Sequence, residues 1–266
     1  MSVERESWGS GDAYERWMGR WSRPLARLFL EWLAVPAQRE WADVGCGTGA
    51  LVQAILDQCA PGRVAGADRS AAYVEDATRR IADPRASFVE ADAQQLPWPD
   101  ASFDAVVSGL VLNFVPSAQR MAAEMARVAR PGAVVAAYVW DYSGGMKMVR
   151  SFWDAAIELR GGDTAMDQAE RFPICRPDAL ESLFVETGLE DVASRPLDFT
   201  MVFRDFDDYW LPFLGRQGSA PTYLASLDEK DQGRIRELLR DRLRPAADGS
   251  IALPARAWAV RGRRGL

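Results

Sequence analysis

The spacing of apolar and polar residues changes repeatedly between positions 40 and 140, and these changes predict strands that alternate with helices. Short apolar runs between turn residues predict buried strands, and longer segments with apolar residues three to four positions apart predict helices. We expect strands at 40–44, 63–67, 86–90, 103–108 and 133–140, with helices at 50–58, 71–81 and 117–128 between them. This alternation predicts a mostly parallel, doubly wound α/β sheet.

The chain is less regular on both sides of this region. Before it, the apolar residues from Leu25 to Leu33 predict an amphipathic helix that is capped by Ser22 and ends before Pro36. After it, we expect helices at 146–159, 177–187, 205–214 and 228–243, and strands at 192–202 and 250–260. Residues 1–37 then form an N-terminal helical flap on a domain of residues 38–266, with lid insertions at about 141–176 and 204–248.

Composition narrows the function classes. The 266 residues are 48% hydrophobic, which is enough for one sizeable core, and the net charge is -6. An acidic chain is a poor electrostatic match for nucleic acid or an anionic membrane, so we expect neither as a partner. We expect the basic residues Arg261, Arg263 and Arg264 to form a solvated C-terminal tail.

The chain also lacks histidine, which excludes Ser-His-Asp and Cys-His chemistry. Its three cysteines, Cys46, Cys59 and Cys175, are irregularly spaced and predict neither disulfides nor a metal site. A soluble protein in the reducing cytoplasm, monomeric or homodimeric, fits this composition.

Glycine alternates with other residues between the first strand and its helix, at Gly45, Gly47 and Gly49. Without a Cβ atom, the backbone can turn sharply there and a ligand can lie against it. The turn also leads into a helix N-terminus, where backbone N–H groups lack partners and the helix dipole is positive. The stretch therefore predicts a site for a nucleotide-type cofactor.

Two cofactors are compatible with this turn. A dinucleotide site is one, because Gly45-x-Gly47-x-x-Ala50 is followed about 20 residues later by Asp68. However, Asp43 precedes the first glycine, where its carboxylate would repel a pyrophosphate, and Asp92 follows the third strand at the same sheet edge. S-adenosylmethionine matches these acids better: Asp43 can attract its amino-acid end, Asp68 can accept from both ribose hydroxyls, and Asp92 from the adenine amino group.

In several segments the sequence resembles the class I S-adenosylmethionine-dependent methyltransferases. The resemblance is to the small-molecule branch that includes ubiquinone/menaquinone C-methyltransferases (methyltransferase type 11). It covers roughly residues 38–140, and the segments that carry it are Asp43–Gly49, Gly66–Ser70, Glu90–Trp98, Ser102–Ser108 and Val128–Gly132. It implies a Rossmann-like, seven-stranded sheet of order 3-2-1-4-5-7-6 with strand 7 antiparallel. The cofactor-binding residues that it implies are Asp43, Gly45, Cys46, Gly47, Gly49, Asp68, Arg69, Asp92, Ala93 and Ser108.

The loop after the fourth strand, residues 108–114, faces the transferring methyl group in family members. Here it lacks the Asn/Asp-Pro-Pro-Tyr/Phe signature of enzymes that methylate bases or glutamine amides, which favours a small-molecule acceptor. We name Tyr14, Asn113 and Tyr142 as candidate catalytic residues, with Asp141 and Glu158 as further candidate bases. Aromatic walls suit a planar or apolar acceptor; the candidate substrate-binding residues are Trp17, Trp21, Asn113, Trp140 and Trp153.

The expected function is transfer of a methyl group, in line, to an O, N or C nucleophile of a small organic molecule. Two alternatives remain. One is an NAD(P)-dependent oxidoreductase on a Rossmann fold, and the other is a non-catalytic module that binds S-adenosylmethionine.

Overall fold

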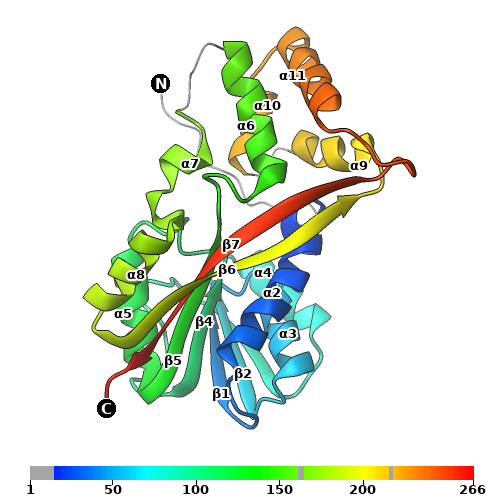
Figure 1. Ribbon diagram of the computed structural model, residues 1–266. Helices are drawn as coiled ribbons and strands as arrows, with labels where there is room; N and C mark the ends of the chain where they lie inside the picture. Colours follow the sequence, from blue (N-terminus) through cyan, green and yellow to red (C-terminus); the bar gives the residue numbers. More distant parts are fainter. Residues whose placement is uncertain (1–14, 161–164, 216–217) are drawn as a thin grey trace. The chain divides into compact units, whose positions relative to one another are not determined.

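The computed structural model describes residues 15–160, 165–215 and 218–266 of the chain (Figure 1). The chain divides into two compact units. Unit 1 comprises the described part of Met1–Arg20 together with Asp141–Pro173 and Asp198–Arg256, and unit 2 comprises Trp21–Trp140, Ile174–Leu197 and Ala257–Leu266. These bounds differ from the division expected from the sequence, since residues 21–37 belong to unit 2 with the sheet.

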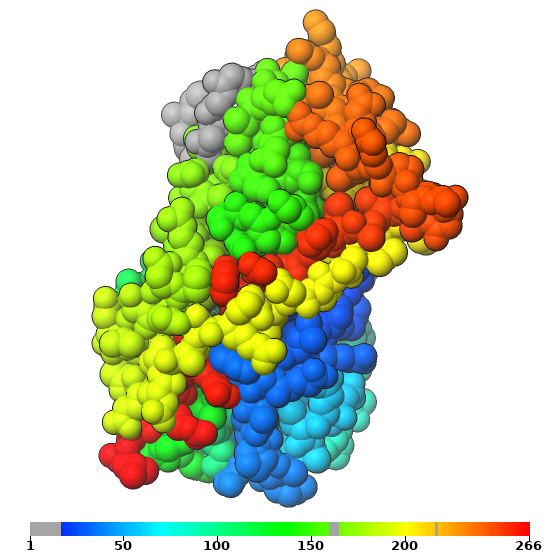
Figure 2. All heavy atoms as spheres, in the orientation of Figure 1, coloured from blue at the N-terminus to red at the C-terminus, as the bar shows by residue number. Residues whose placement is uncertain are grey.

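In the described part of the chain, one mixed sheet holds seven strands. They are β1 (Glu40–Val44), β2 (Arg63–Asp68), β3 (Ala86–Glu90), β4 (Phe103–Gly109), β5 (Ala129–Trp140), β6 (Leu189–Phe203) and β7 (Ile251–Arg264). Their order is β3-β2-β1-β4-β5-β7-β6, with β1 to β5 paired in parallel and β7 antiparallel to β5. The Rossmann-like α/β fold and the strand order implied by the resemblance are therefore confirmed. β3 and β6 are the edge strands, and the residues of β6, in yellow, run along the molecular surface in Figure 2.

The central strands of unit 2 are buried along almost their whole length. Trp41 to Val44 of β1 and Val64 to Asp68 of β2 are all buried. Such continuous burial is typical of parallel strands that are covered on both faces. The helices of this unit are α2 (Arg20–Leu33), α3 (Ala50–Gln58), α4 (Ala71–Arg80), α5 (Ala118–Val128) and α8 (Pro177–Glu186).

These helices lie beside strands that are their neighbours along the chain. α3 packs beside β2, α4 beside β2 and β3, and α5 beside β4, β5 and α8. Serine side chains cap two of the helices: Ser70 accepts a hydrogen bond from the Tyr73 N–H, and Ser117 accepts one from the Arg120 N–H. Each cap begins a helix directly after a loop at the carboxyl end of a strand, which keeps those loops short and in place.

Unit 1 is built on an aromatic core. Its helical elements are the π-helical turn η1 (Glu15–Gly19), α6 (Lys147–Arg160), α7 (Gln168–Arg171), α9 (Phe206–Trp210), the 3-10 turn η3 (Leu211–Gly215), α10 (Ser219–Ala225) and α11 (Glu229–Arg242). A further 3-10 turn, η2 (Pro173–Cys175), lies at the unit boundary. Phe152 stacks on Phe213 at 4.9 Å between ring centroids, and Trp17 meets Phe213 edge to face at 4.9 Å. The buried hydroxyl of Tyr209 donates to the Met148 carbonyl at 3.0 Å.

The structure corrects three sequence-based expectations on elements. α2 begins at Arg20, directly after η1, so Ser22 lies inside the helix and does not cap it. β5 begins at Ala129 and not at the expected residue 133, because residues 130–132 form an irregularity within the strand, between the pairs Phe103–Ala129 and Ala105–Val134. α10 was not expected, since its sequence contains Pro221 and reads as a loop.

The expected solvated tail is also wrong. Residues 261–264 belong to β7, and their arginine side chains bond to backbone carbonyl groups. Arg261 donates to the Trp32 carbonyl and Arg263 to the Gly132 carbonyl, both at 3.1 Å, and Arg264 donates to those of Arg127 and Ala129. Guanidinium groups supply several donors in a fixed geometry, so they can satisfy carbonyls at the margin of the sheet. Among the described residues, no helix has the length and hydropathy needed to cross a bilayer.

Candidate functional site

The turn between β1 and α3 depends on glycine at its first and third glycine positions. Gly45 and Gly49 have φ angles of 78° and 87°, where residues with a Cβ are strained. A Cβ atom at Gly45 would lie 2.6 Å from the Val111 side chain, and one at Gly49 would lie 2.5 Å from Cδ1 of Ile81. Both glycines therefore serve packing, since neighbouring side chains occupy the space that a Cβ atom needs.

Gly47, between them, faces open space. Its φ angle is 53°, and a Cβ atom there would meet no atom within 4 Å. Its N–H donates to Oδ2 of Asp68 at 2.9 Å. The middle of the turn is thus the part of the backbone that a ligand can approach.

Asp43, at the carboxyl end of β1, is the most unusual acid in unit 2. Its side chain is 1% exposed, and neither carboxylate oxygen has a hydrogen-bond partner among residues 15–160, 165–215 and 218–266. Burial, and to a smaller extent the nearby charge of Asp68, raise its pKa to about 8. A buried acid without donors requires either a proton or a cationic partner, and a positively charged ligand group would supply the second.

Asp68, at the end of β2, is also buried but has donors. It is 9% exposed, and its two oxygens accept from the N–H groups of Gly47 and Ser70, each at 2.9 Å. Burial raises the pKa of its carboxyl group, while these two N–H groups and the exposed Arg69 oppose the rise. A carboxylate has about four lone-pair sites, so Asp68 keeps acceptor capacity for ligand hydroxyls.

Asp92, after β3, contrasts with both. It is exposed and accepts from the N–H of Gln94 at 2.8 Å and from the Gln94 side-chain amide at 3.1 and 3.3 Å. These bonds to Gln94 lower the pKa of its carboxyl group. Ala93 beside it is half-buried, and the Ala91 N–H donates to the Asp68 carbonyl at 2.9 Å, which ties this end of β3 to β2.

Ser108 and Cys46, two further predicted cofactor-binding residues, are both buried. The buried Ser108 hydroxyl donates to the Val44 carbonyl at 2.7 Å and so holds β4 against β1. The buried Cys46 thiol has its pKa raised well above the usual range, by burial first and then by Asp43 and Asp68. Both side chains contribute to the shape of the turn, and the raised pKa makes Cys46 a poor nucleophile.

The loop after β4 packs directly on the glycine turn. It starts with a non-glycine residue in the left-handed region, Leu110 at φ 64°, whose N–H donates to the Tyr138 carbonyl at 2.8 Å. Val111 fills the space against Gly45, as described above. Asn113 is 9% exposed, and its Nδ2 atom has no hydrogen-bond partner in the part of the chain that the structure describes. Sequence patterns single out Asn113 but give no signal for Leu110 and Val111, because neither residue type favours a turn.

The other predicted acceptor-side residues are divided between the units. Tyr14 lies outside the described residues. Trp17, Tyr142 and Trp153 are buried in unit 1, where the Trp153 indole N–H donates to Oε1 of Gln168 at 2.5 Å. Trp21 and Trp140 are buried in unit 2. The four indole rings thus contribute to hydrophobic cores, and their substrate-binding roles stay predictions.

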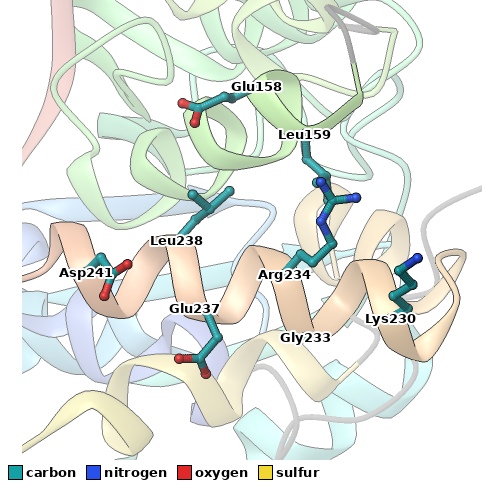
Figure 3. Close-up of a pocket in the computed structure, with 8 residues that line it drawn as sticks. All are labelled: Glu158, Leu159, Lys230, Gly233, Arg234, Glu237, Leu238 and Asp241. Carbon is teal, nitrogen blue, oxygen red and sulfur yellow. The ribbon is translucent and has the colours of Figure 1, made fainter.

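The candidate bases Asp141 and Glu158 both lie in unit 1. Asp141 is buried and accepts from the Ser143 hydroxyl at 2.6 Å, and Glu158 is exposed and pairs with Arg242. Glu158 also lines a groove of about 510 Å³ between α6 and α11 (Figure 3). The other residues that line it are Leu159, Lys230, Gly233, Arg234, Glu237, Leu238 and Asp241. The groove mixes both charges and contains none of the residues predicted to bind the cofactor, so it is a separate surface feature.

Comparison with known proteins bears on the site in unit 2. Residues 42–137 match a protein family described as "Methyltransferase domain". This segment runs from the end of β1 to β5 and includes the glycine turn, Asp43, Asp68 and Asp92. Residues 42–137 form a methyltransferase domain.

Individual relatives agree with this domain. The chain is 37% identical to a demethylmenaquinone methyltransferase of Roseiflexus sp. over 103 residues, 39% of this chain and 43% of that protein. It is 27% identical to a trans-aconitate 2-methyltransferase of Deinococcus radiodurans over 214 residues, 78% of this chain and 79% of that protein. The chain spans less than half the length of the first of these curated relatives.

A solved structure extends the likeness over most of the chain. The phosphoethanolamine N-methyltransferase 2 of Haemonchus contortus, in complex with S-adenosyl-L-methionine, superposes with a TM-score of 0.58 at 16% identity. The superposition covers 96% of this chain and 56% of that protein. At this identity the likeness shows the fold, and it includes elements beyond the methyltransferase domain.

Proposed function

We propose that this protein is an S-adenosylmethionine-dependent methyltransferase that acts on a small organic molecule. The observation that carries the proposal is Asp43, a carboxyl group that is buried without donors among the described residues and lies four positions before the open Gly47. A cation in this place stabilises the ionised form of the acid, whereas a phosphate would offer it no compensating charge. S-adenosylmethionine contains an ammonium group and a sulfonium and no phosphate.

Three groups of unit 2 fit the remaining parts of that cofactor. Asp68 keeps acceptor capacity for the ribose hydroxyls, and its bond from Gly47 holds the turn at the same time. Asp92 and Ala93 lie at the end of the neighbouring strand β3, where we expect the adenine ring. When bound, the cofactor supplies an electrophilic methyl group on a cationic sulfur. The chain positions the acceptor, and holding a nucleophile in line is a large part of the acceleration of such a displacement.

The dinucleotide alternative fits the site less well. The dinucleotide-binding fold has strand order 3-2-1-4-5-6, whereas this sheet has seven strands with β7 antiparallel. In addition, a pyrophosphate at the turn would need backbone N–H donors, and those of Gly45 and Cys46 donate to the Ala67 carbonyl at 2.7 and 2.9 Å. Asp43 would then face the phosphate charge without compensation.

We propose Asn113 as the residue that contacts the acceptor or the transferring group. Its loop lies against the glycine turn through Val111, and its side-chain nitrogen has no partner among the described residues. An amide donor suits an oxygen of the acceptor molecule. The named relatives act on chemically different molecules, demethylmenaquinone and trans-aconitate, so the acceptor is proposed only as a small organic molecule.

Two measurements test the function. Calorimetry with S-adenosylhomocysteine and NADH in parallel is expected to show binding of the first alone, and binding of NADH alone would overturn the proposal. Incubation with cofactor labelled on its methyl group and a panel of phenols, quinones, carboxylic acids and amines is expected to transfer label. Asn113→Ala is expected to reduce that transfer at least tenfold with cofactor affinity within about threefold, since it removes one hydrogen bond.

A further inference from the structure

Asp43 lies in a part of unit 2 where the residues that the structure describes offer it no positive charge. Gly66 of β2 and Val107 of β4 flank it in the sheet, and the titratable groups around it are Asp68 and the Cys46 thiol. Residues 109–116 after β4 and residues 50–53 at the start of α3 contain no charged side chain. The surrounding elements therefore add negative charge or none.

The cations nearest along the neighbouring elements are engaged elsewhere. Arg69 is exposed and acts on Asp68 and Asp92, and Arg79 and Arg80 of α4 both pair with Asp76. The N–H groups that follow Asp43 are also unavailable to it, because those of Gly45 and Cys46 donate to the Ala67 carbonyl. Within residues 15–160, 165–215 and 218–266, neither a salt bridge nor a backbone donor stabilises the Asp43 carboxylate.

We infer that Asp43 is a neutral acid before ligand binding and that the ammonium group of the cofactor causes it to ionise, so that cofactor binding releases one proton. This inference rests on the proposed function. The proton passes from the Asp43 carboxyl to the buffer, and the carboxylate left behind pairs with an ammonium that the ligand already carries. No covalent bond to carbon changes, and no electron is transferred.

The pH dependence of binding follows from this exchange. Because burial and the nearby Asp68 raise the pKa of Asp43 to about 8, the acid is protonated at neutral pH, and ionising it costs more as pH falls. The Kd for S-adenosylhomocysteine is expected to fall nearly tenfold per pH unit between pH 6 and 7.5. Above pH 8 the gain stops, since the Asp43 carboxyl is then already ionised in the free protein.

Proton release can be measured by calorimetry in buffers of different ionisation enthalpy at pH 6.5, where the ligand amine is almost fully protonated. The slope of observed enthalpy against buffer enthalpy is expected to give about one proton released with S-adenosylhomocysteine. The probe 5′-methylthioadenosine retains the adenine, ribose and thioether but has no amino-acid end. Its binding is expected to release about none.

Matched variants locate the proton. Asp43→Asn is expected to release no proton with either ligand and to lose the pH dependence between pH 6 and 7.5. Its affinity for 5′-methylthioadenosine stays within about threefold of the wild type, because that ligand does not reach the acid. Asp57→Asn, which changes an exposed acid on α3, is expected to behave as the wild type.

The outcomes separate this inference from the proposed function. Binding of S-adenosylhomocysteine with no proton release would overturn the inference and leave the function intact. Equal release with both ligands would also overturn it, because the proton would then come from another group. If neither ligand bound, the function and the inference would fail together. The comparison of the two ligands needs only the wild-type protein, so it decides the matter even if Asp43→Asn does not fold.

Discussion

Asp43 and Asp92 end two parallel strands at the same edge of one sheet, yet their surroundings are opposite. Asp43 is buried without a hydrogen-bond partner among the described residues, and Asp92 is exposed with bonds from Gln94. The difference comes from the backbone that follows each acid. Two residues after Asp92, the Gln94 N–H turns back to the carboxylate, whereas two residues after Asp43 the Gly45 N–H donates to the Ala67 carbonyl.

This comparison shows how one fold makes two kinds of acid from the same side chain. An acid that receives a backbone N–H from its own turn is stabilised as an anion and is ready to accept from neutral donors. When the N–H groups that follow an acid donate instead to the neighbouring strand, the acid receives no backbone donor and can pair with a cation. Asp68 lies between the two, because it is buried but receives the N–H of Ser70 two residues later.

The largest expected effect is on the pH dependence of the unfolding free energy, and it comes from Asp43, the buried acid of β1. The pKa of Asp43 is about 8 in the folded protein and about 3.9 in the unfolded protein. Between these two pH values the folded state therefore binds more protons than the unfolded state. Unfolding free energy therefore falls as pH rises from 4 to 8, by about 1.4 kcal/mol per unit from this group. Asp43→Asn removes this slope, so between pH 5 and pH 8 it should gain about 4 kcal/mol relative to the wild type.

Urea denaturation of both proteins without ligand, at several pH values, measures this difference. Asp92→Asn serves as the control, since bonds from Gln94 lower the pKa of Asp92 and the slope from this acid then lies below pH 4. Parallel curves for the wild type and Asp43→Asn between pH 5 and 8 would contradict the comparison.

The next effect tests how tightly the β1 end is built. Gly45→Ala introduces a Cβ atom at φ 78° and 2.6 Å from Val111, and is expected to cost about 3 kcal/mol of unfolding free energy. Gly47→Ala changes the open position of the same turn and should cost about 1 kcal/mol, from backbone strain alone. Equal losses in the two variants, measured by denaturation, would show that Val111 does not confine Gly45.

Substitution of Asp68 is expected to have an intermediate effect, which falls on the binding of S-adenosylhomocysteine. Asp68→Ala removes the acceptor for two N–H groups and for the ribose hydroxyls, so affinity for S-adenosylhomocysteine should fall at least several-fold. Asp68→Asn keeps one oxygen acceptor and is expected to lose less. Calorimetry at pH 7.5 measures both, and unchanged affinity in Asp68→Ala would contradict the ribose assignment.

Sequence patterns could predict the strands and the acids at their ends, because both follow from local signals. The short apolar runs at β1 and β2 and the alternating glycines indicate a parallel sheet with a cofactor turn at its edge. What they could not predict is which acid is compensated. That depends on the Ala67 carbonyl of β2, which accepts hydrogen bonds from the N–H groups of Gly45 and Cys46. It also depends on Val111, which packs against Gly45 although it lies 66 positions later in the chain.

The aromatic residues show a second limit of sequence patterns. Trp17, Phe152, Trp153 and Phe213 suggest walls for an apolar acceptor, but the same residue types build a hydrophobic core. In unit 1 their rings pack on one another, as in the stacked pair Phe152–Phe213. Amphipathic spacing gives the face of a helix that is buried and does not say whether protein or ligand covers it.

The smallest effect is expected for substitution of Asp92, the exposed acid. Asp92→Asn keeps an oxygen that can accept from the Gln94 N–H, and the side chain is in solvent, so the unfolding free energy should change by less than about 0.5 kcal/mol. If Asp92 accepts from the adenine amino group, the Asn variant loses only the charge assistance of that bond, and the Kd for S-adenosylhomocysteine should rise by no more than about tenfold.

Calorimetry with S-adenosylhomocysteine and its inosine analogue, whose purine ring has no amino group, isolates that bond. The wild type should prefer the adenine ligand, and Asp92→Asn should narrow the preference, whereas an equal preference in both proteins would assign adenine recognition to a group other than the Asp92 carboxylate.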